Sequence, residues 1–138
     1  MDLKKKRIPP KRLGDVAEVC LLLKAMFLGF IVSRPYTMNA PFDFILYWPP
    51  SGRLTRVQVK STAHSANNFY QVNLQTKHRR YTSKNVDLIA VYIMPHDAWY
   101  IVPIKAVPLT SPALSLAPTR PGTRCWTEPY REAWHLLK

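Results

Sequence analysis

The chain has 138 residues, of which 47% are hydrophobic, so it can bury one core but is too short for two comfortable domains. Its 20 lysines and arginines outnumber its 8 aspartates and glutamates, and the resulting net charge of +12 favours a polyanionic partner, nucleic acid before an acidic membrane face. The two cysteines, Cys20 and Cys125, lie far apart, which argues against a disulfide framework and a structural zinc site.

The composition along the chain predicts three parts. Residues 1–12 are expected to form a basic arm, residues 13–107 one folded domain, and residues 108–138 a proline-rich extension. The arm carries a run of four basic side chains: Lys4, Lys5, Lys6 and Arg7. This run suits either a flexible arm that contacts phosphates or a nuclear-localisation patch.

The first element expected is a helix between Gly14 and Gly29, with Asp15 as its cap. At 3.6-residue spacing, one face would carry Val16, Val19, Cys20, Leu23, Met26 and Phe27. The opposite side is apolar too, so we expect this helix to be covered by the sheet and by a second subunit. The apolar run is short of a membrane span, so we expect a soluble, cytoplasmic protein with no membrane partner.

Strand patterns follow the helix. The segments expected to be strands are 30–34, 42–48, 54–60, 69–74, 86–93 and 98–104, the fourth of them at a sheet edge. A Pro-Pro-Ser-Gly turn joins the second and third, and Met-Pro-His-Asp joins the last two. Between the fourth and fifth, residues 75–85 are expected to form a basic connection or a short helix.

The extension after Pro108 has low periodicity and is expected to wrap the surface. Near its end, Thr127 could cap a terminal helix that docks through one face formed by Tyr130, Trp134 and Leu137.

Polar side chains interrupt the hairpin formed by residues 42–60. Because strand side chains alternate, Gln58 and Lys60 share one face, and pairing through the turn brings them towards Asp43. Carboxylate and amide oxygens suit Mg²⁺, for which Mn²⁺ could substitute. Asp43 is the expected principal ligand, with the Gln58 amide oxygen and the Val59 carbonyl beside it.

Two further residues complete the predicted site. Lys60 would position or deprotonate a water and stabilise developing charge, and Glu18 would join the site directly or through water. Each of these residues also has a purely structural explanation. Gln58 and Lys60 could lie on an ordinary exposed strand face, and Asp15 and Glu18 could form a capping box.

The order of these residues resembles the PD-(D/E)XK nuclease superfamily. The match consists of a glutamate in the first helix, Pro-Phe-Asp at the start of a hairpin and Gln-Val-Lys at its end, within about residues 13–107. More narrowly, the chain is similar to the bacterial family that includes intron-encoded homing endonucleases. The resemblance implies an α+β fold with an αβββαβ core and a mixed central sheet.

The resemblance also assigns roles. It implies that Asp43 binds metal, that Lys60 is catalytic and that Glu18 is the helix glutamate, whereas Gln58 stands where most of the superfamily has an acid. The function it implies is a Mg²⁺-dependent endonuclease of double-stranded DNA, of homing type, working as a homodimer or homotetramer without an organic cofactor. The alternatives are a junction-resolving or repair nuclease, and an inactive DNA-binding module on the same scaffold.

Basic and polar side chains elsewhere are the expected DNA contacts. Besides the basic run at 4–7, they are Arg34, Tyr36, Asn39, Arg53, Arg56, Ser61, Thr62, His64, Lys77, Arg79 and Arg80. For Arg53 and Arg56 the plainer alternative is solvation of an edge strand.

Overall fold

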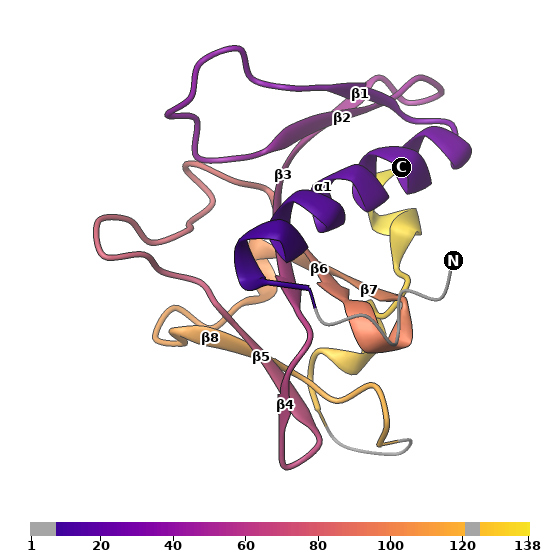
Figure 1. Ribbon diagram of the computed structural model, residues 1–138. Coiled ribbons are helices and arrows are strands. Elements are labelled where there is room, and N and C mark those ends of the chain that lie inside the picture. The colour runs from indigo at the N-terminus through magenta and orange to yellow at the C-terminus, as the bar shows by residue number, and fades with distance from the viewer. Residues whose placement is uncertain (1–7, 121–124) are drawn as a thin grey trace.

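The structure is a computed structural model that describes residues 8–120 and 125–138, so the basic run at 4–7 lies outside the described residues. Within these described residues, one α-helix and eight strands follow one another (Figure 1). They are α1 (Pro10–Phe27), β1 (Ile31–Ser33), β2 (Phe44–Trp48), β3 (Arg53–Thr62), β4 (Ser65–Ala66), β5 (Phe69–Asn73), β6 (Leu88–Ile93), β7 (Ala98–Pro103) and β8 (Ala113–Leu116). Short 3-10 turns cover Met94–His96, Ile104–Ala106, Glu128–Tyr130 and Trp134–Leu137.

The main sheet has five strands in the order β1-β2-β3-β6-β7. Strands β3 and β6 are parallel, and every other pair in this sheet is antiparallel, so the expected mixed sheet of an α+β fold is confirmed. The parallel pair lies at the centre, where strands are covered on both faces. The β3 strand lies between β2 and β6, but β6 pairs with it only from Val57 to Thr62. Arg53 and Arg56 therefore lie on a stretch that pairs with β2 alone, and the interpretation that they solvate an edge stays a prediction.

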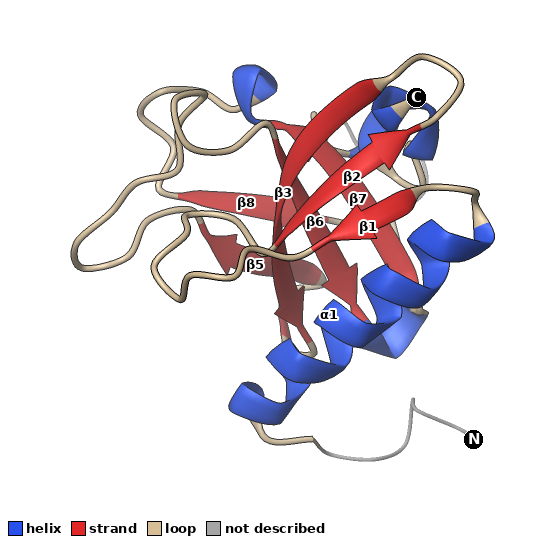
Figure 2. Cartoon of the chain, turned by 90° about the horizontal axis from the view of Figure 1, so that it is seen from above, coloured by secondary structure: helices blue, strands red, loops and turns tan. Residues whose placement is uncertain are grey.

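Alternate side chains of the central strands feed two separate cores. In β6, Tyr92 packs in the core under α1, whereas Ile89 and Val91 pack in the core under the second sheet. That sheet has three strands, in the order β4-β5-β8, and lies across the main sheet from α1 (Figure 2). The molecule therefore has three layers, and β6, being buried on both faces, is apolar at every position.

The helix begins earlier and buries a different face than the sequence predicted. It starts at Pro10. Proline is favoured in a first turn because the backbone N–H that it lacks would have no acceptor within the helix there. Asp15 therefore lies inside the helix and does not cap it. The buried face consists of Leu13, Ala17, Leu21 and Ala25. The small alanine side chains allow the helix to approach the sheet closely. The sequence prediction chose the face that carries the larger apolar side chains and therefore did not identify this one. Within residues 8–120 and 125–138, no helix is long and apolar enough to cross a membrane.

The other apolar face of α1 is exposed. Its members Val19, Leu23, Met26 and Phe27 are 57% to 83% exposed. Gly29 ends the helix with a φ of +93°, a left-handed conformation that glycine adopts without strain, so the predicted end is confirmed.

The connection between β3 and β6 differs from the expected core. In the described part of the chain no second α-helix lies there, and the hairpin of β4 and β5 followed by a loop over 75–85 takes its place. The predicted strand at 69–74 exists as β5, but it is the middle strand of the second sheet and not an edge, because β8 pairs with its other side.

The extension contributes to both cores. Leu114 and Leu116 of β8 are fully buried, so this part is not only a surface wrapping. The expected terminal helix is two 3-10 turns instead, since Glu132 between them takes a φ of +49°. Trp134 and Leu137 nevertheless pack in the core under α1, and the C-terminal segment that carries them lies beside the end of α1 (Figure 1). Tyr130, predicted on the same face, packs instead against the core under the second sheet.

An internal ion pair ties β3 to the segment before β6. The Arg56 guanidinium donates to both carboxylate oxygens of Asp87 at 2.9 and 3.0 Å and to the carbonyls of Ser83 and Lys84. The Asp87 carboxylate also accepts the Arg56 backbone N–H at 2.8 Å. These hydrogen bonds from Arg56 hold the pKa of Asp87 below its usual value.

Replacing Asp87 by asparagine is expected to lower the free energy of unfolding at neutral pH by about 1 kcal/mol. Because the folded-state pKa of Asp87 is depressed, its contribution is present above the unfolded pKa, near 4, and is lost as pH falls through the folded-state value. Urea unfolding of parent and Asp87→Asn should therefore differ at neutral pH and converge in acid. Asp15→Asn, which removes an exposed carboxylate, is the control, and a difference independent of pH would contradict this prediction.

Candidate active site

Asp43 lies immediately before β2 and is held against β3 by two hydrogen bonds. Its backbone N–H donates to the Val57 carbonyl at 2.9 Å, and its Oδ2 accepts the Val59 N–H at 2.7 Å. The side chain thus extends the ladder between β2 and β3 by one bond. This places the carboxylate beside the Gln58–Lys60 segment, as the alternation of the two strands predicted.

Gln58 and Lys60 flank Val59 in the part of β3 that extends past the end of β2. The Gln58 amide N–H donates to the Val59 carbonyl at 3.3 Å, so the two oxygens nominated as ligands belong to adjoining groups. The Lys60 Nζ lies 4.9 Å from the centre of the Tyr81 ring. A cation over an aromatic face is attracted by the electron density of the ring, so Tyr81 holds the lysine at this end of the sheet.

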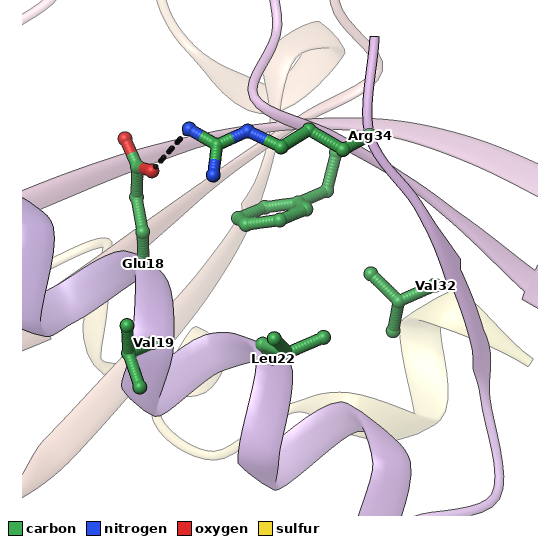
Figure 3. Close-up of a pocket in the computed structure, with 6 residues that line it drawn as sticks. Glu18, Val19, Leu22, Val32 and Arg34 are labelled. Carbon is green, nitrogen blue, oxygen red and sulfur yellow. Dashed lines mark hydrogen bonds and ion pairs between the residues drawn. The ribbon is translucent and has the colours of Figure 1, made fainter. Parts of the chain in front are cut away.

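Glu18 faces Arg34 across a small cavity. The Arg34 guanidinium donates to Glu18 Oε2 at 3.0 Å, and both residues line a cavity of about 160 Å³ with Phe44 and Val32 (Figure 3). Since Asp15 is not at the start of the helix, the capping-box alternative for Glu18 was wrong. The side chain points instead towards Arg34, which directly follows β1.

A second cavity adjoins Asp43. It has a volume of about 350 Å³ and is lined by Asp43, Phe42 and the loop after β1, including Arg34 and the exposed Tyr36. Arg34 lines both cavities and so lies between the helix glutamate and the strand aspartate. The opening beside Asp43 is bounded by residues that the sequence predicted as DNA contacts.

The two carboxylates have raised pKa values. Burial is the main cause for Asp43, opposed by the hydrogen bond from Val59 and by the charges of Lys60 and Arg34. Burial is also the main cause for Glu18, with the negative charge of Asp43 adding to it and Arg34 opposing it. A cation bound beside Glu18 and Asp43 would relieve the repulsion by which the Asp43 charge raises the pKa of Glu18.

The donor set fits a hard divalent cation of low protein coordination number. Glu18 and Asp43 offer carboxylate oxygens, and Gln58 and Val59 offer an amide and a carbonyl oxygen. Mg²⁺ prefers oxygen ligands and usually keeps several waters, so two acids suffice. Residues 8–120 and 125–138 contain no group of three or more His, Cys, Asp or Glu side chains arranged to hold a metal.

The other predicted DNA contacts divide by their surroundings. Ser61 and Thr62 end β3 and are half-buried, while Asn39, His64, Lys77 and Arg79 are exposed. Arg80 donates to the carbonyls of Pro108 and Ser111, and Arg53 to that of Lys138. Together with the Arg56 pair, these bonds give three of the arginines a structural role, and a DNA contact for any of these residues stays a prediction.

Sequence reasoning missed Tyr81 as part of the site. It lies on the connection over 75–85, 21 positions after Lys60, where no periodic pattern links the two. The aromatic side chain beside a run of basic residues was the only local signal, and it does not identify the partner.

Known proteins can now be compared with this arrangement. The profile of the family described as "PD-(D/E)XK endonuclease" matches residues 8–137. No curated protein sequence matches the chain. Among solved structures, the bacterial homing endonuclease I-Ssp6803I is 25% identical, with a TM-score of 0.80 and a match that covers 95% of this chain and 92% of that one.

A Holliday junction resolvase, Hjc from the archaeal hyperthermophile Archaeoglobus fulgidus, is 19% identical over 76% of this chain and 84% of its own, with a TM-score of 0.49, a likeness too weak to carry an argument. The structural match to the homing endonuclease confirms the restriction-endonuclease-like fold. Since the family profile spans nearly the whole sequence, the chain belongs to the PD-(D/E)XK endonuclease family.

Proposed function

We propose that this protein is a Mg²⁺-dependent endonuclease that hydrolyses phosphodiester bonds in double-stranded DNA. The observation that carries the proposal is the bond from the Val59 N–H to Asp43 Oδ2, 2.7 Å, which holds a carboxylate beside Gln58 and Lys60. A net charge of +12 supports a polyanionic substrate.

The residues have distinct roles in this proposal. Asp43, Glu18, Gln58 and the Val59 carbonyl hold the cation. Bound there, Mg²⁺ supplies positive charge for the phosphate oxygens and lowers the pKa of a coordinated water. Lys60, kept at the sheet end by Tyr81, donates to the phosphate and orients the attacking water. The loop that carries Arg34 and Tyr36 borders the cavity through which the backbone approaches.

The homing-type role rests on likeness to the bacterial homing endonuclease, which covers nearly all of both chains. Such an enzyme cuts both strands of a duplex. The site described above belongs to one chain, so we propose that the protein works as a homo-oligomer, a dimer or a tetramer, that presents one site to each strand.

A DNA-cleavage assay tests the proposal. Supercoiled plasmid and long linear duplexes should be nicked or cut in Mg²⁺ or Mn²⁺ and left intact in EDTA, whereas a synthetic four-way junction should be cut no faster than duplex. Preference for the junction would instead favour the resolving or repair nuclease. Tight DNA binding with no cleavage in either metal would favour the inactive DNA-binding module on the same scaffold. The neutral Gln58, at a position where most of the superfamily has an acid, is the residue that suggests this alternative.

Replacing Gln58 by glutamate is expected to lower the Mg²⁺ concentration for half-maximal cleavage by about tenfold. The change adds a charged ligand to a site with two acids, and ligand charge raises cation affinity. Titrating Mg²⁺ in the cleavage assay and by calorimetry measures the effect. Gln71→Glu on β5, where the side chain is exposed, adds the same charge elsewhere and is the control. Equal Mg²⁺ dependence in parent and Gln58→Glu would remove this residue from the metal site.

A further inference from the structure

Among the described residues, Arg34 is the basic side chain that pairs with the Glu18 carboxylate. Its guanidinium donates to Glu18 Oε2 at 3.0 Å, and in the described part of the chain this is its only hydrogen bond. The ring of Phe44 lies beneath it, 5.7 Å from the guanidinium carbon to the ring centre. Figure 3 shows the guanidinium extended over the cavity towards Glu18.

The attachment of Arg34 is loose compared with that of Arg56. The Arg56 guanidinium makes four hydrogen bonds to Asp87 and to two carbonyls, and 32% of its side chain is exposed. The Arg34 side chain is 69% exposed and held by one ion pair and by the face of the Phe44 ring, so little has to break for it to move. Arg34 lies directly after β1, outside the strand.

The balance of charges around Glu18 and Asp43 favours movement of the Arg34 guanidinium when a cation binds. Glu18 and Asp43 carry two negative charges, and Arg34 and Lys60 supply two positive ones that act on them. A divalent cation among the same carboxylates would leave this cluster with excess positive charge and would compete directly with Arg34 for Glu18. A DNA phosphate entering beside Asp43 would supply the anion that a displaced guanidinium needs, and Arg34 lines that cavity too.

We propose that Arg34 is an exchangeable counterion. Without metal its guanidinium neutralises Glu18, and when the cation and DNA enter it transfers from Glu18 to a phosphate oxygen of the backbone. The exchange leaves Glu18 to the cation and gives the phosphate a planar donor suited to bidentate contact. This inference rests on the proposed function, and it adds a coupling between metal and DNA binding that the ligand residues alone do not supply.

Mg²⁺ binding without DNA is the first test. Calorimetric titration with MgCl₂ should show that Arg34→Ala binds Mg²⁺ more tightly than the parent, by about threefold or more, because its competitor is gone. Lys105→Ala, which removes an exposed positive charge far from the site residues in the sequence, should match the parent. Arg34→Gln is a second variant in case the alanine variant does not fold.

DNA binding provides the second readout. For a fluorescent duplex, the gain in affinity between EDTA and Ca²⁺ should be smaller by about tenfold in Arg34→Ala, since one charge-assisted contact made only in the metal-bound state is lost. Arg34→Lys keeps the positive charge but lacks the planar guanidinium that can donate two parallel hydrogen bonds, so it should retain part of that gain.

The outcomes separate the two proposals. If the parent binds Mg²⁺ and cuts DNA while Arg34→Ala binds Mg²⁺ no more tightly, the exchange is overturned and the nuclease stands. If the Ca²⁺-dependent gain in DNA affinity is equal in parent and Arg34→Ala, the phosphate contact is overturned. A parent that neither binds Mg²⁺ nor cuts DNA overturns the proposed function and the exchange with it.

Discussion

Replacing Lys60 by alanine is expected to reduce the rate of DNA cleavage by about 100-fold or more while leaving the fold intact. Removing a group that stabilises transition-state charge commonly costs this much. The positive charge of the ammonium acts on the Asp43 carboxylate, and the ammonium lies over the ring of Tyr81. Single-turnover cleavage at saturating Mg²⁺ measures the effect, and circular dichroism checks the fold.

Asp43→Asn is the companion variant and should lose cleavage to a similar degree. Asparagine keeps an oxygen that can accept the Val59 N–H, so the ladder between β2 and β3 survives while the charged ligand disappears. Lys105→Ala should cut like the parent. If Lys60→Ala and Asp43→Asn both cut at parental rates, the active site lies elsewhere in the chain.

Leu21→Ala is expected to lower the free energy of unfolding by about 2 to 5 kcal/mol. The Leu21 side chain is fully buried at the centre of the face that α1 packs on the main sheet. Truncation removes apolar contacts and leaves a cavity between helix and sheet that the alanines on either side cannot fill. Urea unfolding followed by tryptophan fluorescence measures the loss.

Leu23→Ala is the matched control, the same change two positions along the helix. This side chain is 57% exposed, so the expected loss is within about 0.5 kcal/mol. Unfolding at two protein concentrations separates the contribution of subunit association, because burial of this face by a second subunit would make the Leu23→Ala effect depend on concentration. A larger loss for Leu23→Ala than for Leu21→Ala at both concentrations would show that the helix is rotated.

The strands were predictable because their signal is local. Alternation in 42–48 and 54–60 and the turn between them identified β2 and β3 to within a few residues, and the apolar runs at 86–93 and 98–104 identified β6 and β7. The helix was harder. Apolar residues lie all round it, so periodicity could not choose between its faces, and the small alanines that touch the sheet carry a weak signal.

In the site, too, the contacts that follow from local strand patterns were predictable and those that depend on packing were not. Asp43, Gln58 and Lys60 could be brought together from the hairpin, since pairing register follows from alternation and from the turn. The partner of Glu18 could not, because Arg34 lies 16 positions away and the contact depends on the angle between α1 and β1. The stacking of Tyr81 on Lys60 depends on a loop that no pattern describes.

By itself the sequence determined which chemical groups are available at the site. These are an aspartate, a glutamine and a lysine on one hairpin of a basic chain, and they could be identified because residue types and strand alternation are local properties. Only the tertiary structure decided which charges face one another. The close packing of α1 on the sheet sets Glu18 against Arg34, and the β4–β5 hairpin with its following loop brings Tyr81 over Lys60. Contacts of this kind arise from the packing of distant elements, which no single segment encodes.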